Sequence, residues 1–120
     1  MLYFSYGSFM DFETIKEHSP QAKYIGRAKL FNFKLVYNFY SSQYKGGCAS
    51  TEFSPGNVTY GVLYDIDELE MKNLDIAEGC LNAKYYRQEV IVVDENGKAL
   101  KAWTYRTTNP DGYHTPSRKY

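Results

Sequence analysis

Strand-type segments surround a single confident helix, and this arrangement leaves few folds open to the chain. Segments rich in β-branched and aromatic residues are residues 2–5, 22–40, 48–53, 58–66 and 88–106. The last of them, "QEVIVVDENGKALKAWTYR", joins two apolar runs through Asn96-Gly97, the strongest short-range signal for a β-hairpin. Strands and helices do not alternate regularly, so a doubly wound parallel sheet is not favoured. We predict an α+β fold: a small, mostly antiparallel β-barrel with flanking helices.

Local signals predict where these elements begin and end. The turn sequence "SPGN" at residues 54–57 is expected to separate two strands. A short helix over "FETIKEH" is predicted to end at Pro20. The main helix, "DELEMKNLDIAEG", is expected to begin at Asp67, which pairs with Glu70 in a capping-box pattern, and to stop at Gly79.

Length and charge exclude several classes of protein. The 120 residues predict one domain, residues 1–120, with a hydrophobic core of its own. Lys and Arg number 14, as do Asp and Glu, and this balance argues against broad electrostatic binding to nucleic acid or an anionic membrane. No apolar run approaches the ~20 residues of a membrane span, and no signal-peptide pattern is visible, so a cytoplasmic location is expected. Two Cys and two His do not make a typical zinc site, and we predict no metal and no other cofactor.

A carboxylate stands at an unusual place on the main helix. Met71, Leu74 and Glu78 fall at positions i, i+3 and i+7, so they share one face. A different, solvated polar face is expected to hold Glu68, Lys72 and Asp75. Glu78 therefore extends an apolar stripe, and it stands in the last turn, where the helix dipole disfavours negative charge. Burial and the dipole would both raise the pKa of the Glu78 carboxyl, as a general acid or base near neutral pH requires. The alternative is that Glu78 reaches water at the helix end.

Other chemistry-bearing residues give weaker signals. Ser8 lacks the G-x-S-x-G context of a nucleophile elbow, and "KGGCAS" lacks the Lys-Ser/Thr of a phosphate-binding loop. A ligand carboxylate could meet an arginine, although most Arg side chains lie on protein surfaces. The arginines considered for this role are Arg27, Arg87, Arg106 and Arg118.

Several short motifs occur together in one order. They are "YFSYGSFM" near the start, "YKGGCAST" in mid-chain, "YGVLYDI" leading into "LDIAEG", then Tyr85, and "PSRKY" at the end. In this order and spacing the sequence resembles the γ-glutamylcyclotransferase-like (AIG2-like) family over nearly its whole length. The resemblance implies a small β-barrel with flanking helices and a pocket at one barrel end. It also implies an enzyme that converts a small-molecule γ-glutamyl amide to 5-oxoproline and a free amine, without a cofactor.

The resemblance further implies roles for individual residues. Glu78 matches the family's catalytic glutamate, which acts as general acid and base. The segment from Tyr3 through Ser8 matches the strand and turn that hold the γ-glutamyl group through backbone groups. Tyr120 matches a tyrosine that reaches the substrate. The positions implied to bind substrate are Tyr3, Tyr6, Gly7, Ser8, Phe9, Tyr85 and Tyr120.

Two departures from the family pattern leave alternatives open. Phe9 stands where the family usually has Asn, so an aromatic ring replaces a side-chain amide, and the chain ends at Tyr120, where relatives often continue. The alternatives to an enzyme are a non-catalytic module that binds γ-glutamyl ligands and a β-barrel interaction domain that uses exposed tyrosines. The sequence does not identify the leaving amine, nor does it decide between a monomer and a homodimer.

Overall fold

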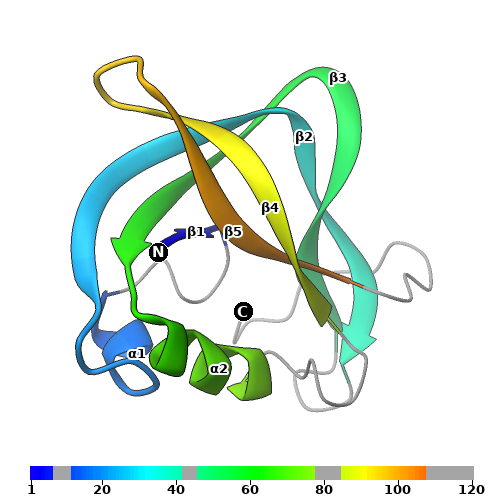
Figure 1. Cartoon of the computed structure of the whole chain (residues 1–120). Helices are drawn as coiled ribbons and strands as arrows, with labels where there is room; N and C mark the ends of the chain where they lie inside the picture. The colour runs from blue at the N-terminus through cyan, green and yellow to red at the C-terminus, as the bar shows by residue number, and fades with distance from the viewer. Residues whose placement is uncertain (7–11, 42–45, 78–84, 108–120) are drawn as a thin grey trace.

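The computed structural model describes residues 1–6, 12–41, 46–77 and 85–107 (Figure 1). The elements in chain order are β1 (Leu2–Ser5), α1 (Phe12–Lys16), β2 (Lys23–Ser41), β3 (Gly46–Asp65), α2 (Glu68–Ala77), β4 (Tyr85–Asp94) and β5 (Ala99–Thr107). The predicted site residues that lie outside the described residues are Gly7, Ser8, Phe9, Glu78 and Tyr120. Within the described ranges, no helix has the length and apolar character needed to cross a membrane.

The described strands close into a barrel in the order β1-β3-β2-β4-β5. Neighbouring strands are antiparallel except β1 and β5, which run parallel with Tyr3 opposite Trp103. Both helices lie on the same side of the barrel (Figure 1). The prediction of a small, mostly antiparallel barrel with flanking helices is confirmed.

The β4–β5 hairpin forms where Asn96-Gly97 predicts it. Gly97 has a φ of 80°, a left-handed conformation that glycine adopts without strain. The Asp94 carboxylate accepts hydrogen bonds from the backbone N–H groups of Asn96 and Lys98, each at 2.9 Å. The turn's own residues therefore satisfy its backbone donors, as Asp at the start of a turn commonly does.

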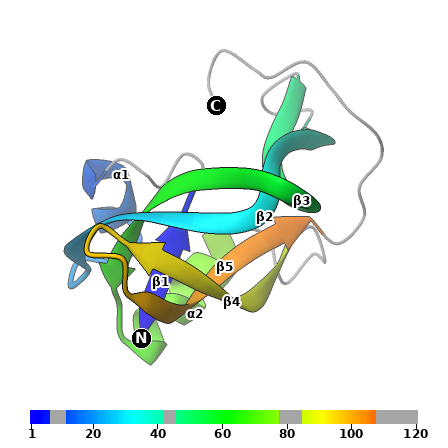
Figure 2. The same ribbon diagram turned by 90° about the horizontal axis from the view of Figure 1, so that it is seen from above.

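The prediction of two strands separated at residues 54–57 is wrong. β3 runs continuously through this stretch, and these residues bulge out of its ladder with β2. Opposite them, Asn32 has a φ of 68°, and its Oδ1 accepts a 3.2 Å hydrogen bond from the Gly56 N–H. The turn-forming residues thus build a bulge, which bends the long β2–β3 pair without ending it. Beyond the bend, β2 and β3 continue as a two-stranded arm whose far end projects from the barrel (Figure 2).

Hydrophobic side chains form two clusters, one inside the barrel and one between the barrel and the helices. The inner cluster consists of Phe4, Tyr6, Ala28, Leu30, Leu63, Val90, Val92 and Ala102. The outer cluster consists of Tyr3, Ile15, Ala22, Val62, Tyr64, Ile66, Met71, Leu74 and Tyr105. Because β1 contributes to both clusters, both of its faces are buried, and its position depends on the barrel and on the helices together.

α2 begins and packs largely as its sequence predicts. Asp67 Oδ1 accepts a 2.8 Å hydrogen bond from the Glu70 N–H, which is the N-cap interaction. The Glu70 carboxylate instead accepts hydrogen bonds from the Ser19 hydroxyl at 2.7 Å and the Gln21 N–H at 3.0 Å, so it ties α2 to the segment after α1. Met71 and Leu74 are fully buried, which confirms the apolar face of the helix.

Candidate active site

The chain segments that hold the predicted site residues all join the barrel at one end, which we call the site end. β1 and β5 run parallel, and β4 runs antiparallel to β5 with Tyr85 opposite Thr107. Residues 7–11 follow β1, residues 78–84 precede β4, and residues 108–120 follow β5. Predicted residues that are far apart in the sequence are therefore attached to the same end of the barrel.

Two predicted tyrosines, Tyr3 on β1 and Tyr6 directly after it, lie in different hydrophobic clusters. Tyr3, 3% exposed, lies in the outer cluster, where its ring meets the Tyr105 ring edge-on with 5.6 Å between centroids. Tyr6 lies in the inner cluster, and its hydroxyl donates a hydrogen bond to the backbone carbonyl of Tyr105. Tyr105, which sequence analysis did not single out, thus contacts both tyrosines and ties the end of β1 to β5.

Tyr105 also joins the barrel to α2. Its hydroxyl donates a 2.6 Å hydrogen bond to Asp75 Oδ1. The Asp75 side chain is only 20% exposed, so the prediction that it lies on the solvated face of the helix is wrong. Asp75 comes four residues after Met71 and directly after Leu74, and this spacing places it at the border of the buried stripe. That border position is the signal by which sequence analysis could have found it.

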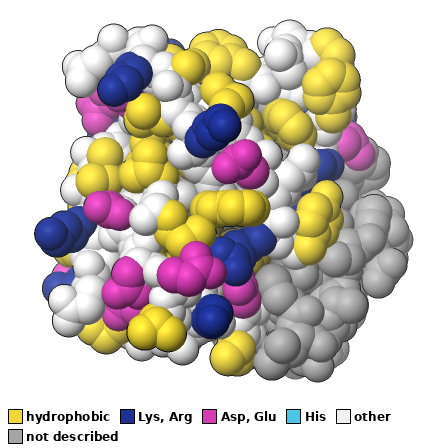
Figure 3. Space-filling view, in the orientation of Figure 1, with side chains coloured by type: hydrophobic (Ala, Val, Ile, Leu, Met, Phe, Trp, Pro, Cys, Tyr) yellow, Lys and Arg dark blue, Asp and Glu magenta, His cyan; other side chains and the backbone are white. Residues whose placement is uncertain are grey.

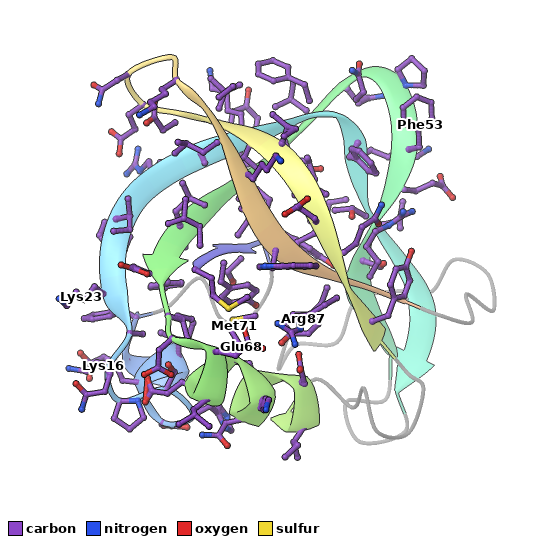
Figure 4. The ribbon with its side chains drawn as sticks, in the orientation of Figure 1. Lys16, Lys23, Phe53, Glu68, Met71 and Arg87 are labelled. Carbon is purple, nitrogen blue, oxygen red and sulfur yellow. The ribbon has the colours of Figure 1, made fainter. Side chains whose placement is uncertain are left out.

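Arg87 completes a charged cluster between α2 and β4. Its Nε lies 3.1 Å from Asp75 Oδ1, and its Nη2 lies 3.8 Å from Glu68 Oε1. The guanidinium lies over the Trp103 ring, 5.4 Å from the centroid. Figure 4 shows Arg87 reaching from β4 toward α2. With an opposite charge on one side and an aromatic face on the other, the Arg87 side chain is held in one position.

The Asp75–Arg87 ion pair connects α2 and β4, the two elements on either side of residues 78–84. Asp75 lies near the end of α2, before this segment, and Arg87 lies near the start of β4, after it. Their side chains are 20% and 23% exposed, so water screens this pair less than a fully exposed one. Glu78 is the first residue of this segment and directly follows α2, which the ion pair connects to β4.

Replacing Asp75 by Ala is expected to lower the free energy of unfolding by about 2 kcal/mol, because Asp75 accepts a hydrogen bond from Tyr105 and pairs with Arg87. Denaturant unfolding followed by circular dichroism measures the change. Lys72→Ala, an exposed position on the same helix, is the control and should change stability by less than about 0.5 kcal/mol. A double-mutant cycle of Asp75→Ala with Tyr105→Phe should show coupling, and strictly additive effects would contradict the interaction.

A separate groove of about 650 Å³ lies between β2, β3 and β4, close to the β4–β5 turn. Its lining residues are Arg27, Ala28, Lys29, Tyr60, Gly61, Val62, Val93, Asp94 and Glu95. Of the predicted substrate-binding residues that the structure describes, Tyr3, Tyr6 and Tyr85, none lines it, and the β4–β5 turn is at the opposite end of β4 from Tyr85. This groove is therefore distinct from the site end.

Charges of both signs are mixed on the face of the molecule shown in Figure 3. On that face, acidic and basic side chains stand among hydrophobic ones. The described side chains there do not form the continuous basic stripe by which proteins bind nucleic-acid backbones.

Comparisons with known proteins agree with the barrel and extend over nearly the whole chain. The family described as "Gamma-glutamyl cyclotransferase, AIG2-like" matches residues 3–120. Gamma-glutamylcyclotransferase from Bos taurus is 32% identical over 123 residues, and the Homo sapiens protein of that name is 34% identical over 125 residues. Each alignment covers 99% of this chain and 65% of the relative, so the chain spans less than two thirds of the length of these curated relatives.

The structural comparison gives the same result. A solved structure named "Gamma-glutamyl cyclotransferase" superposes with a TM-score of 0.93 at 31% identity, covering 100% of this chain and 73% of that one. The family match over residues 3–120 and the shared fold at 31% identity agree on the family of this chain. The chain belongs to the γ-glutamyl cyclotransferase, AIG2-like family.

Proposed function

We propose that this protein is a γ-glutamylcyclotransferase, which converts a γ-glutamyl amide to 5-oxoproline and a free amine. Glu78 is the general acid and base, and the segment from Tyr6 to Ser8 holds the γ-glutamyl group. Membership of the γ-glutamyl cyclotransferase, AIG2-like family supports the reaction class.

One structural observation supports this choice of residues. The segments that contain Gly7 and Glu78 join the barrel at the same end, and Tyr105 contacts both the strand before the first segment and the helix before the second. A site made of two distant segments needs such a rigid connection, because catalytic groups must be held close to their reacting geometry.

The reaction needs no nucleophile from the protein. The α-amino nitrogen of the substrate attacks its own γ-carbonyl carbon, which forms the five-membered ring. Holding the glutamyl chain folded places these two atoms in contact, and such positioning can supply several kcal/mol of the barrier. Backbone N–H groups after Tyr6 are suited to bind the glutamyl α-carboxylate or the oxyanion that develops on the γ-carbonyl oxygen.

Proton transfers complete the reaction. The Glu78 carboxylate removes a proton from the α-ammonium group, so the nitrogen has a free electron pair for attack. After the ring bond forms, the carboxyl returns a proton to the departing nitrogen as the amide C–N bond breaks. The ring nitrogen loses a second proton to water, because it changes from an ammonium group to a lactam N–H. The products are 5-oxoproline, a free amine and one proton, and Glu78 ends in the state in which it began.

The test is formation of 5-oxoproline by the purified chain from a panel of γ-glutamyl amides. We expect 5-oxoproline and free amine in equal amounts, measured by chromatography at several time points against a sample without protein. Calorimetric titration with the same compounds separates two ways in which the proposal can fail. Binding without product indicates a γ-glutamyl-binding module, and neither binding nor product indicates an unrelated role for the barrel.

A further inference from the structure

The groove between β2, β3 and β4 lies on the outer face of the barrel wall, away from the site end. Lys29 is at its centre, because it is opposite Tyr60 on β3 and opposite Val93 on β4. Ala28 and Leu30, the neighbours of Lys29 on β2, belong to the inner cluster, so the Lys29 side chain points outward. The groove volume of about 650 Å³ lies within the ~300–1,000 Å³ that small-molecule sites usually have.

Two cationic side chains in this groove lack an ion-pair partner among the described residues. Arg27 and Lys29 are two positions apart on β2, and both are exposed on its outer face. Neither forms an ion pair with an acidic residue in the part of the chain that the structure describes. The Lys29 ammonium group instead lies over the Tyr60 ring, 5.8 Å from its centroid. The charges of both side chains are therefore available to a ligand.

The two acidic residues that line the groove interact with backbone groups. Asp94 Oδ1 accepts hydrogen bonds from two N–H groups of the β4–β5 turn, and Glu95 Oε1 accepts a 2.9 Å hydrogen bond from the Arg27 N–H. A Cβ at Gly26 would lie 2.9 Å from that Glu95 oxygen, so the glycine leaves room for this contact. Both carboxylates thus satisfy backbone donors rather than the side chains of Arg27 and Lys29.

An exposed aromatic ring forms one wall of the groove. Tyr60 is 66% exposed on β3, and Val62, two positions further along the same strand, lines the groove together with Val93 of β4. A planar ring of a ligand can stack on such an exposed aromatic side chain, and stacking on aromatic residues is a common way in which proteins bind nucleobases. The groove therefore combines two cations with a surface for stacking.

We propose that this groove binds a mononucleotide, with its phosphate between Arg27 and Lys29 and its base against the Tyr60 ring. A phosphate monoester carries a charge of about −1.5 to −2 near pH 7, which the two cations match, and the Arg27 guanidinium fits two phosphate oxygens at once. Glu95 lines the same groove, and acidic side chains accept hydrogen bonds from ribose hydroxyls in dinucleotide sites. This inference is independent of the proposed function, because no residue of the groove belongs to the proposed active site.

A free mononucleotide fits these charges better than a nucleic-acid strand does. A strand contacts its protein through several successive phosphates and needs an extended row of cations. The carboxylates of Asp94 and Glu95 line the groove beside the two cations and would repel the further phosphates of a strand.

Isothermal titration calorimetry of the whole chain with AMP, adenosine and inorganic phosphate tests the proposal. AMP combines the phosphate with the planar base, so we expect it to bind at least about 10-fold more tightly than either adenosine or inorganic phosphate. Raising the ionic strength should weaken the binding of AMP and leave that of adenosine nearly unchanged. Equal affinities for AMP and inorganic phosphate would indicate a simple anion site and overturn the mononucleotide. A protein that does not bind AMP would overturn the proposal outright.

Variants of the groove residues locate the binding site. Arg27→Gln and Lys29→Gln should each weaken AMP binding about 10-fold or more and affect adenosine much less. Tyr60→Leu should weaken the binding of both compounds about fivefold or more, because it removes the stacking surface. Lys101→Gln, at an exposed lysine on β5 outside the groove, is the matched control and should leave both affinities unchanged. If Arg27→Gln and Lys29→Gln bound AMP as the wild type does, the nucleotide would bind elsewhere and the proposal would be wrong.

Two further measurements separate this proposal from other functions of the protein. If an adenylate strand of about ten nucleotides bound much more tightly than AMP, with an affinity that fell steeply with salt, the groove would be a nucleic-acid surface and the mononucleotide would be wrong. Arg27→Gln and Lys29→Gln should leave 5-oxoproline formation unchanged, and Glu78→Gln should leave AMP binding unchanged. The nucleotide site and the proposed function therefore fail or hold separately.

Discussion

Glu78→Gln is expected to lower kcat for 5-oxoproline formation by about 100- to 10,000-fold, the range that a positioned general acid–base supplies. Glutamine has nearly the same size as glutamate but cannot take a proton from the substrate's α-ammonium group or return one to the departing nitrogen. KM should change far less than kcat, because the proposed contacts to the γ-glutamyl group come from the segment after Tyr6. Initial rates of 5-oxoproline release over a range of substrate concentrations measure both constants.

Glu89→Gln is the matched control for this substitution. Glu89 is exposed on β4, and the same chemical change there should leave kcat within about twofold of the wild type. Melting temperatures of both variants separate lost chemistry from lost folding. If Glu78→Gln retained the wild-type kcat, Glu78 would not be the proton-transfer group, and a different residue would have to be sought at the site end.

Features that depend on neighbouring residues were predictable from the sequence. The Asn96-Gly97 hairpin and the Asp67 cap depend on residues within about four positions of one another, so local patterns identify them. The buried stripe at Met71 and Leu74 follows from the helical repeat alone. The turn at residues 54–57 was recognised locally too, but its role as a bulge depends on Asn32, more than twenty positions earlier.

The charged cluster at the site end could not be predicted, because its members come from three distant elements. Tyr105 donates to Asp75 across 30 positions, and this contact exists only because the parallel β1–β5 pair and the packing of α2 bring β5 beside the helix. Nothing in the sequence around Arg87 distinguishes it from Arg106. The structure separates them by their surroundings: carboxylates face Arg87, whereas a carbonyl, an amide and a phenyl ring face Arg106.

Gly61→Ala is expected to lower the free energy of unfolding by about 3 kcal/mol or more, a large effect for one methyl group. A Cβ at Gly61 would lie 2.4 Å from the backbone oxygen of Ser5 and 2.7 Å from the Phe4 ring, closer than real Cβ atoms come to other heavy atoms. Phe4 is fully buried in the inner cluster, so its ring has little room to turn away. β1 would have to move from β3, and in a chain of 120 residues the melting temperature should fall by about 10 °C or more.

The same displacement would reach the proposed site, because Ser5 is followed by Tyr6 and the segment that is proposed to hold the γ-glutamyl group. We therefore expect the folded fraction of Gly61→Ala, measured below its melting temperature, to have a raised KM as well. Gly97→Ala is the control: it has open space around the added methyl group but a φ of 80°, so backbone strain alone should cost about 1 kcal/mol without affecting KM. A Gly61→Ala variant no less stable than Gly97→Ala would contradict the close approach of β1 to β3, on which the position of the proposed γ-glutamyl-binding segment depends.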